Sequence, residues 1–208
     1  MTSPLLLVSE FPVEPNAVDK AVTVIREQVS GDGRPQGSLY RGLEAPTVLE
    51  LTPVDTLAQL DPLLEGWGAL FAELAPLLTG DVRRQALRFV GAPKPAAEQL
   101  PDTRYVQLRH VEVRPPVYEE YLAWREGTIF AEVHKSPKIE TFLAYHSLVS
   151  TEPGVMFVSG FSCPPEEYLQ VFTSERYAEI GRQAHPRFVT DEGLYTRLYE
   201  RLTGAEGA

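Results

Sequence analysis

The chain has 208 residues, of which 43% are hydrophobic and 10% aromatic, enough to bury the core of one large or two small domains. Its net charge of -10, with no run of Lys or Arg to follow a phosphate backbone, argues against nucleic acid as a partner. The one cysteine, Cys163, cannot close an intramolecular disulfide, and the apolar run 4–8 is too short for a signal peptide or a membrane span, so we expect a cytoplasmic protein with no membrane partner.

The first half of the chain predicts the element order β-α-β-β-α-β. Apolar residues recur every three or four positions from Val18 to Val29, which is typical of an amphipathic helix, and Asp61 with Pro62 begins a second helix. The apolar run near the start and the short segments on either side of Pro46 predict strands. The predicted strands are 5–11, 38–43, 47–51 and 82–90, and the predicted helices are 16–29 and 61–78.

The second half repeats this order after a break. Residues 91–103 contain Pro93, Pro95 and Pro101 and show no alternation of apolar and polar residues, which is typical of a linker. The predicted strands after it are 105–113, 140–149, 154–161 and 193–202, and the predicted helices are 115–133 and 174–188. The sequence therefore predicts two domains, residues 1–90 and 104–208, on either side of this linker.

The two halves also match in their residues. Segments 39–43 and 48–51 align with 144–148 and 155–158. A ferredoxin-like β-α-β-β-α-β unit has both helices on one face of its sheet, and consecutive apolar residues such as 5–8 indicate that the other face is covered too. We therefore expect an α+β protein in which two tandem ferredoxin-like units pack as an intramolecular pseudo-dimeric α+β barrel.

These segments, together with 168–169 and 171–177, resemble the dimeric α+β barrel superfamily, and within it the antibiotic biosynthesis monooxygenase-like group, here in tandem. The resemblance covers about residues 4–90 and 104–203. It implies an aromatic-lined pocket in each half, between the sheet and its helices, and an oxidoreductase activity. The group includes cofactor-independent oxygenases of aromatic polyketides, polyketide cyclases and haem-degrading enzymes. Haem degraders carry an iron-binding His early in the last helix, where this chain has Gly181.

The histidines are candidates for the catalytic base. The chain has four, all in the second half, and two of them, His134 and His185, lie near predicted helix ends, where a positive charge favourably meets the helix dipole. His110 and His146 instead lie inside predicted strands, on faces that they share with apolar residues. A neutral buried His can accept a proton from a phenol or an enolisable carbon. The alternative is a core His that is hydrogen-bonded to a backbone group.

Arg125 and several aromatic residues complete the predicted site. Arg125 stands where helical spacing calls for an apolar residue, so it either points inward, to hold a carboxylate or an oxyanion, or lies at a solvated edge. Tyr145 is predicted to stabilise the anion with it. The residues predicted to bind a planar substrate are Trp124, Tyr121, Phe157 and Tyr177. Aromatic residues at such spacing are more often part of a plain hydrophobic core.

These features lead to one main functional hypothesis and three alternatives. No group of His, Asp, Glu and Cys has the spacing of metal ligands, so we expect no metal site. The main hypothesis is a cofactor-independent monooxygenase of secondary metabolism, with an aromatic or polyketide-like small molecule and molecular oxygen as its partners. The alternatives are a polyketide cyclase or aromatase, a haem-binding oxygenase, and a non-catalytic protein that binds small molecules. A homodimer stays open.

Overall fold

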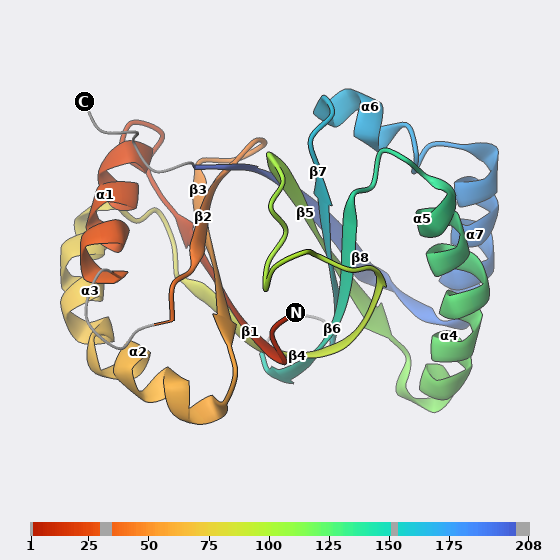
Figure 1. The fold of residues 1–208 in the computed structure, drawn as a ribbon, viewed down its shortest axis with the longest axis horizontal. Helices are drawn as coiled ribbons and strands as arrows, with labels where there is room; N and C mark the ends of the chain where they lie inside the picture. Colours follow the sequence, from red (N-terminus) through yellow and green to blue (C-terminus); the bar gives the residue numbers. More distant parts are fainter. Residues whose placement is uncertain (1, 30–34, 151–153, 203–208) are drawn as a thin grey trace.

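The computed structural model describes residues 2–29, 35–150 and 154–202. In this part of the chain, eight antiparallel strands close into one barrel in the order β1-β3-β2-β8-β5-β7-β6-β4. Helices from the first half cover one side of the barrel, and helices from the second half cover the opposite side (Figure 1). No helix in the described ranges is long and apolar enough to cross a membrane.

The first half supplies four neighbouring strands of the barrel, in the order β4-β1-β3-β2. Its elements are β1 (Leu5–Pro12), α1 (Val18–Val29), β2 (Ser38–Gly42), β3 (Thr47–Val54), η1 (Leu57–Leu60), α2 (Asp61–Glu65), α3 (Trp67–Leu74), η2 (Ala75–Leu77) and β4 (Arg83–Lys94).

The second half supplies the other four strands, in the order β8-β5-β7-β6. Its elements are β5 (Tyr105–Val113), η3 (Pro115–Val117), α4 (Tyr118–Arg125), the π-helical turn η4 (Glu126–Phe130), α5 (Ala131–Lys135), β6 (Thr141–Val149), β7 (Val155–Phe161), α6 (Pro165–Leu169), α7 (Glu175–Arg187) and β8 (Val189–Arg201). Pairing of β2 with β8 and of β4 with β6 joins the two groups of strands and closes the barrel.

Alternation along the strands separates three hydrophobic cores. Side chains on one face of the strands fill the barrel, and those on the other face meet the helices of their own half. On β5, for example, Val106 and Leu108 point into the barrel, whereas Tyr105 and Val111 face the second-half helices. The space under the second-half helices is the most aromatic of the three cores. A polar side chain on a second-half strand therefore belongs to one of two separate interiors.

Several predicted boundaries are corrected by the structure. Strand β4 continues to Lys94, so residues 91–94 of the predicted linker are strand. The extension has a partner that the local sequence does not reveal, because β4 pairs with β6 of the other half and Lys94 Nζ donates hydrogen bonds to two carbonyl oxygens near the start of β6. The predicted helices 61–78 and 115–133 are each interrupted, the second by the π-helical turn.

Candidate functional site

The predicted catalytic residues lie on opposite faces of the second-half sheet. Tyr145 and His146 are consecutive on β6, so their side chains point in opposite directions. Tyr145 packs inside the barrel, and His146 faces Tyr118 of α4. His110 also lies inside the barrel, since it continues the inward-facing row of β5. The expectation that one pocket holds His110, Tyr145, His146 and Arg125 is therefore wrong.

His110 is fully buried in the barrel. Its ring stacks on that of Tyr195 with 4.2 Å between the centroids, and its Nε2 lies 2.8 Å from Gln85 Nε2. Burial lowers the pKa of His110 to about 3, and the positive charges of Arg197 and Arg83 act in the same direction. The ring is therefore neutral at physiological pH, but the sheet separates it from the helix-covered space that contains Arg125.

Tyr118 and His146 form a hydrogen-bonded pair on the helix-facing side of the sheet. The Tyr118 hydroxyl lies 2.7 Å from Nδ1 and 2.9 Å from Nε2 of the His146 ring. Burial, followed by the positive charges of Arg125 and Arg88, lowers the pKa of His146, whereas burial raises the pKa of Tyr118. His146 is consequently a neutral proton acceptor near pH 7, and the phenol beside it is protonated.

Arg125 points inward, which is the first of the two orientations considered for it. The residue is only 5% exposed, and its Nε and Nη1 atoms have no hydrogen-bond partner among the described residues. Its guanidinium carbon lies 4.6 Å from the ring centroid of Phe130 and 6.0 Å from that of Phe157. The nearest carboxylate in an ion pair with it is Glu126, 3.6 Å from Nη2 and itself at the surface. Two guanidinium nitrogens that lie among buried aromatic side chains are thus left without an acceptor in the part of the chain that the structure describes, as in an anion-binding group.

The backbone at Arg125 has a feature typical of functional sites. The π-helical turn Glu126–Phe130 follows Arg125 directly, and the Thr128 hydroxyl donates a 2.6 Å hydrogen bond to the Trp124 carbonyl oxygen. Single π-helical turns inside α-helices are rare and occur frequently at functional sites. Here the turn ends α4 at the residue whose guanidinium enters the core.

The other predicted residues surround the same space. Tyr121 and Trp124 stand on α4, with 6.0 Å between their ring centroids, and Trp124 also packs on Phe188. Tyr177 lies near the start of α7, and Phe157 lies on the strand below. Six of the eight predicted site residues therefore share one interior, namely Tyr121, Trp124, Arg125, His146, Phe157 and Tyr177.

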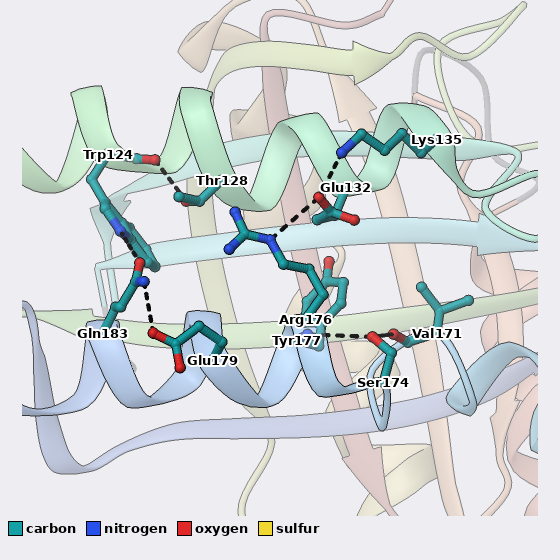
Figure 2. A network of polar contacts seen from close by, with 10 residues as sticks. All are labelled: Trp124, Thr128, Glu132, Lys135, Val171, Ser174, Arg176, Tyr177, Glu179 and Gln183. Carbon is teal, nitrogen blue, oxygen red and sulfur yellow. Dashed lines mark hydrogen bonds and ion pairs between the residues drawn. The ribbon is translucent and has the colours of Figure 1, made fainter.

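Two antiparallel helices form the roof of this space. Figure 2 shows α4 to α5 and α7 side by side over the sheet, bridged near both ends of their contact. At one end Trp124 Nε1 donates to Gln183 Oε1 over 3.4 Å, and at the other Arg176 Nε lies 3.5 Å from Glu132 Oε1. Both bridges are long, and Arg176 is partly exposed. An ion pair between Arg187 and Glu120 also joins α7 to α4 at the surface.

The barrel has a second polar region that the sequence analysis did not identify. A cavity of about 920 Å³ opens at one end of the barrel, and none of the predicted site residues lines it. In its wall, buried Glu10 accepts hydrogen bonds from Arg197 Nη1, at 2.7 and 2.8 Å, and from the Tyr199 hydroxyl. Alternation of Leu6, Val8 and Glu10 on one face of β1 was the signal that could have revealed this inward-facing carboxylate.

Haem does not fit the residues present. The helix position at which haem degraders carry their iron ligand is Gly181, which has no side chain to bind a metal. His110 is enclosed by Gln85 and Tyr195 inside the barrel. Among the described residues there is also no cluster of three or more His, Cys, Asp or Glu that could hold a metal ion.

Comparison with known proteins places this geometry in context. No protein-family model matches the sequence, and no curated protein matches it significantly. Among solved structures, an anthrone oxidase-like protein superposes with a TM-score of 0.73 at 13% identity, over 96% of this chain and 91% of that one. A ferredoxin-fold protein related to antibiotic biosynthesis monooxygenases, from Listeria monocytogenes, superposes with a TM-score of 0.59 at 8% identity, over 98% and 97% of the two chains.

A heme-degrading enzyme from Listeria monocytogenes also superposes, with a TM-score of 0.54 at 8% identity, over 94% of this chain and 98% of that one. This chain has their fold. The prediction of an α+β barrel related to ferredoxin-like proteins is thereby confirmed. At these identities the likeness extends to the fold alone, and any chemistry must be argued from the side chains of this chain.

Proposed function

We propose that the chain is a cofactor-independent oxygenase that acts on an aromatic or polyketide-like small molecule of secondary metabolism. The site is the space between the sheet and helices of the second half. The observation that carries the proposal is the position of Arg125, whose two unpartnered N–H groups enter an aromatic interior near the neutral Tyr118–His146 pair. A proton acceptor and an anion-binding group are what a reaction through a stabilised carbanion requires.

In the first step, His146 takes a proton from an acidic phenol or carbon acid of the substrate. Arg125 binds the resulting phenolate or enolate oxygen, and the low polarity around Phe130 and Phe157 strengthens that interaction. Tyr118 fixes the orientation of the imidazole through its hydrogen bond. Each role requires only the protonation state that burial already gives the group.

In the second step, the electron-rich substrate anion reduces molecular oxygen directly. For a methylene between aromatic rings, loss of one proton and addition of O2, followed by return of the proton from His146, gives a hydroperoxide. Loss of water from the hydroperoxide then leaves a carbonyl group, so that CH2 and O2 become C=O and H2O. The protein supplies a base, an anion site and exclusion of bulk water.

We also infer that the two halves are tandem ferredoxin-like units arranged as an internal pseudo-dimer. The strand orders β4-β1-β3-β2 and β8-β5-β7-β6 correspond element by element, and the two junctions β2–β8 and β4–β6 are equivalent under that correspondence. All four histidines belong to the second half, so chemistry that needs an imidazole base is confined to one of the two units.

The test is oxygen uptake with an anthrone-type substrate such as dithranol. The purified protein should consume one O2 per quinone formed, with or without a metal chelator, and the rate should fall when His146 is replaced. His134→Ala is the matched control, because this exposed helix-end histidine lies outside the site. Conversion of such substrates without oxygen uptake would instead identify a cyclase, and loss of activity with the chelator would contradict cofactor independence.

A further inference from the structure

A second arginine, Arg109, is partly buried and faces the same interior as Arg125. Arg109 on β5 is directly paired with Phe157 on β7, and its guanidinium carbon lies 5.0 Å from the ring centroid of Phe172. Its Nε atom is buried and has no hydrogen-bond partner among the described residues. Because the Arg125 guanidinium lies 6.0 Å from the Phe157 ring, the two arginines flank the same aromatic side chain.

Two phenol groups lie beside these arginines. Tyr121 and Tyr177 are both buried, and the hydroxyl of each lacks a hydrogen-bond partner among the described residues. Burial raises the pKa of Tyr121, against the positive charges of Arg125 and Arg109, and raises that of Tyr177 to about 12, against the charge of Arg109. Both hydroxyls therefore stay protonated at neutral pH and are available as donors.

Two side-chain acceptors that border this interior are already engaged. The Gln107 Oε1 acceptor is already used by the Tyr168 hydroxyl, and the Glu132 carboxylate binds Lys135 and Arg176 at the helix surface. Buried N–H and O–H groups without acceptors destabilise a fold, and buried positive charges without a counter-charge do so more strongly. A site with this composition is suited to a ligand that brings both acceptor oxygens and negative charge.

We infer that the substrate of this site is an aromatic carboxylate, whose carboxylate is bound by Arg109 and Tyr177 while its reacting phenol or enol oxygen is bound by Arg125. The inference rests on the proposed function only for the reaction at Arg125. A guanidinium presents N–H groups in a plane that matches the two oxygens of a carboxylate, which favours this anion over a single phenolate at Arg109. The rings of Phe157 and Phe172 provide the flat apolar surface for the aromatic part.

The test compares a hydroxynaphthoate with the corresponding naphthol, which lacks only the carboxylate, by calorimetric titration of the intact protein. Wild-type protein should bind the hydroxynaphthoate on the order of 10- to 100-fold more tightly, as expected for one charge-assisted pair in a buried site. Arg109→Gln should abolish this difference and leave naphthol binding unchanged. Arg104→Gln is the matched control, because Arg104 is an exposed arginine that pairs with Glu200 at the surface.

Two further variants keep the test decisive if Arg109→Gln does not fold. Arg109→Lys retains the charge and should keep part of the preference for the hydroxynaphthoate, and Tyr177→Phe should reduce that preference several-fold. Equal binding of the two probes by wild-type protein, a preference that survives Arg109→Gln, or no binding of either probe would overturn the inference.

The binding result is independent of turnover, so the two proposals can fail separately. Oxygen uptake with a neutral anthrone, together with equal probe binding, would leave the oxygenase standing and refute the carboxylate site. A preference for the hydroxynaphthoate that depends on Arg109, without oxygen uptake on any electron-rich aromatic acid, would support the carboxylate site and refute the oxygenase.

Discussion

Replacing Arg125 by Met should stabilise the protein while removing its activity. Each buried N–H without an acceptor costs about 1 to 3 kcal/mol, and Arg125 has two such groups. The cation–π contact of Arg125 with Phe130, at 4.6 Å, stabilises the folded wild-type protein by roughly 1 to 2 kcal/mol, and the variant loses it. Met is flexible and fills much of the same space, so the loss of packing is small. The expected net gain is on the order of 0 to 5 kcal/mol, with a midpoint of roughly 2.5 kcal/mol, which corresponds to roughly 5 to 10 °C in Tm for a chain of this length.

The assay is a thermal melt in parallel with oxygen uptake, with Arg182→Met as the control. Arg182 pairs with Glu179 on the surface of α7, and its replacement should change stability by less than about 0.5 kcal/mol. Opposite changes in stability and turnover for the Arg125 variant would indicate that the site keeps an unpaired charge for its ligand. A variant that melts at or below the wild-type temperature would show that the guanidinium is satisfied in the folded protein, and would refute the reasoning.

Three other perturbations test separate parts of the molecule. His146→Ala should reduce turnover on the order of 100- to 10,000-fold but cost only about 1 kcal/mol of stability, because Tyr118 is the one hydrogen-bond partner of the half-buried ring among the described residues. Destabilised protein with full turnover would contradict this. The pKa of His110 is about 3 in the folded protein, below the roughly 6.5 of an unfolded His. The contribution of neutral His110 to the free energy of unfolding is therefore fully present above pH ~6.5 and decreases as the pH falls toward 3. Denaturant melts between pH 4 and 7 should show that the free energy of unfolding decreases less steeply with falling pH in His110→Gln than in the wild type. The control His134→Gln should show the same decrease as the wild type. Glu10→Leu removes the acceptor of the Arg197 and Tyr199 hydrogen bonds at the barrel end. It should lower the free energy of unfolding by about 2 to 4 kcal/mol in chemical denaturation. A loss below about 0.5 kcal/mol would show that the network is solvated.

The α+β barrel could be predicted because the sequence patterns that specify it are local and occur in both halves. Segments 39–51 and 144–158 match in residues and in the position of their turn, and apolar runs on the strands indicate sheets that are covered on both faces. The end of β4 could not be predicted in the same way. Its last residues pair with β6 of the other half, and the proline-containing segment Gly91 to Lys94 gives no local sign of that partner.

Which side chains of the strands face the site is determined by strand alternation more than by residue type. His146 faces the helices as its apolar neighbours indicate, and the same alternation excludes the adjacent Tyr145 from that space. Strand alternation also places Arg109 under the helices, two positions from Gln107. From the sequence alone, a charged residue in a strand is expected to face solvent. The Tyr118–His146 contact joins residues 28 positions apart and depends on how α4 lies on the sheet, which no local pattern encodes.

The proposed tandem arrangement gives a physical reason for the difference between the two halves. The first half also contains a partly buried arginine, Arg84, but its guanidinium stacks on Trp67, with 2.8 Å from its carbon to the ring centroid, and it lines the open cavity at the barrel end. Its Nε atom is buried and unpartnered among the described residues, as are those of Arg109 and Arg125, but among these three arginines only Arg125 has a second such atom, Nη1. Because an uncompensated buried charge such as that of Arg125 is costly, the fold can keep it only if the rest of the barrel supplies stability. The apolar core of the first half and the closed strand ladder provide that stability, which allows the second half to keep buried donors without acceptors.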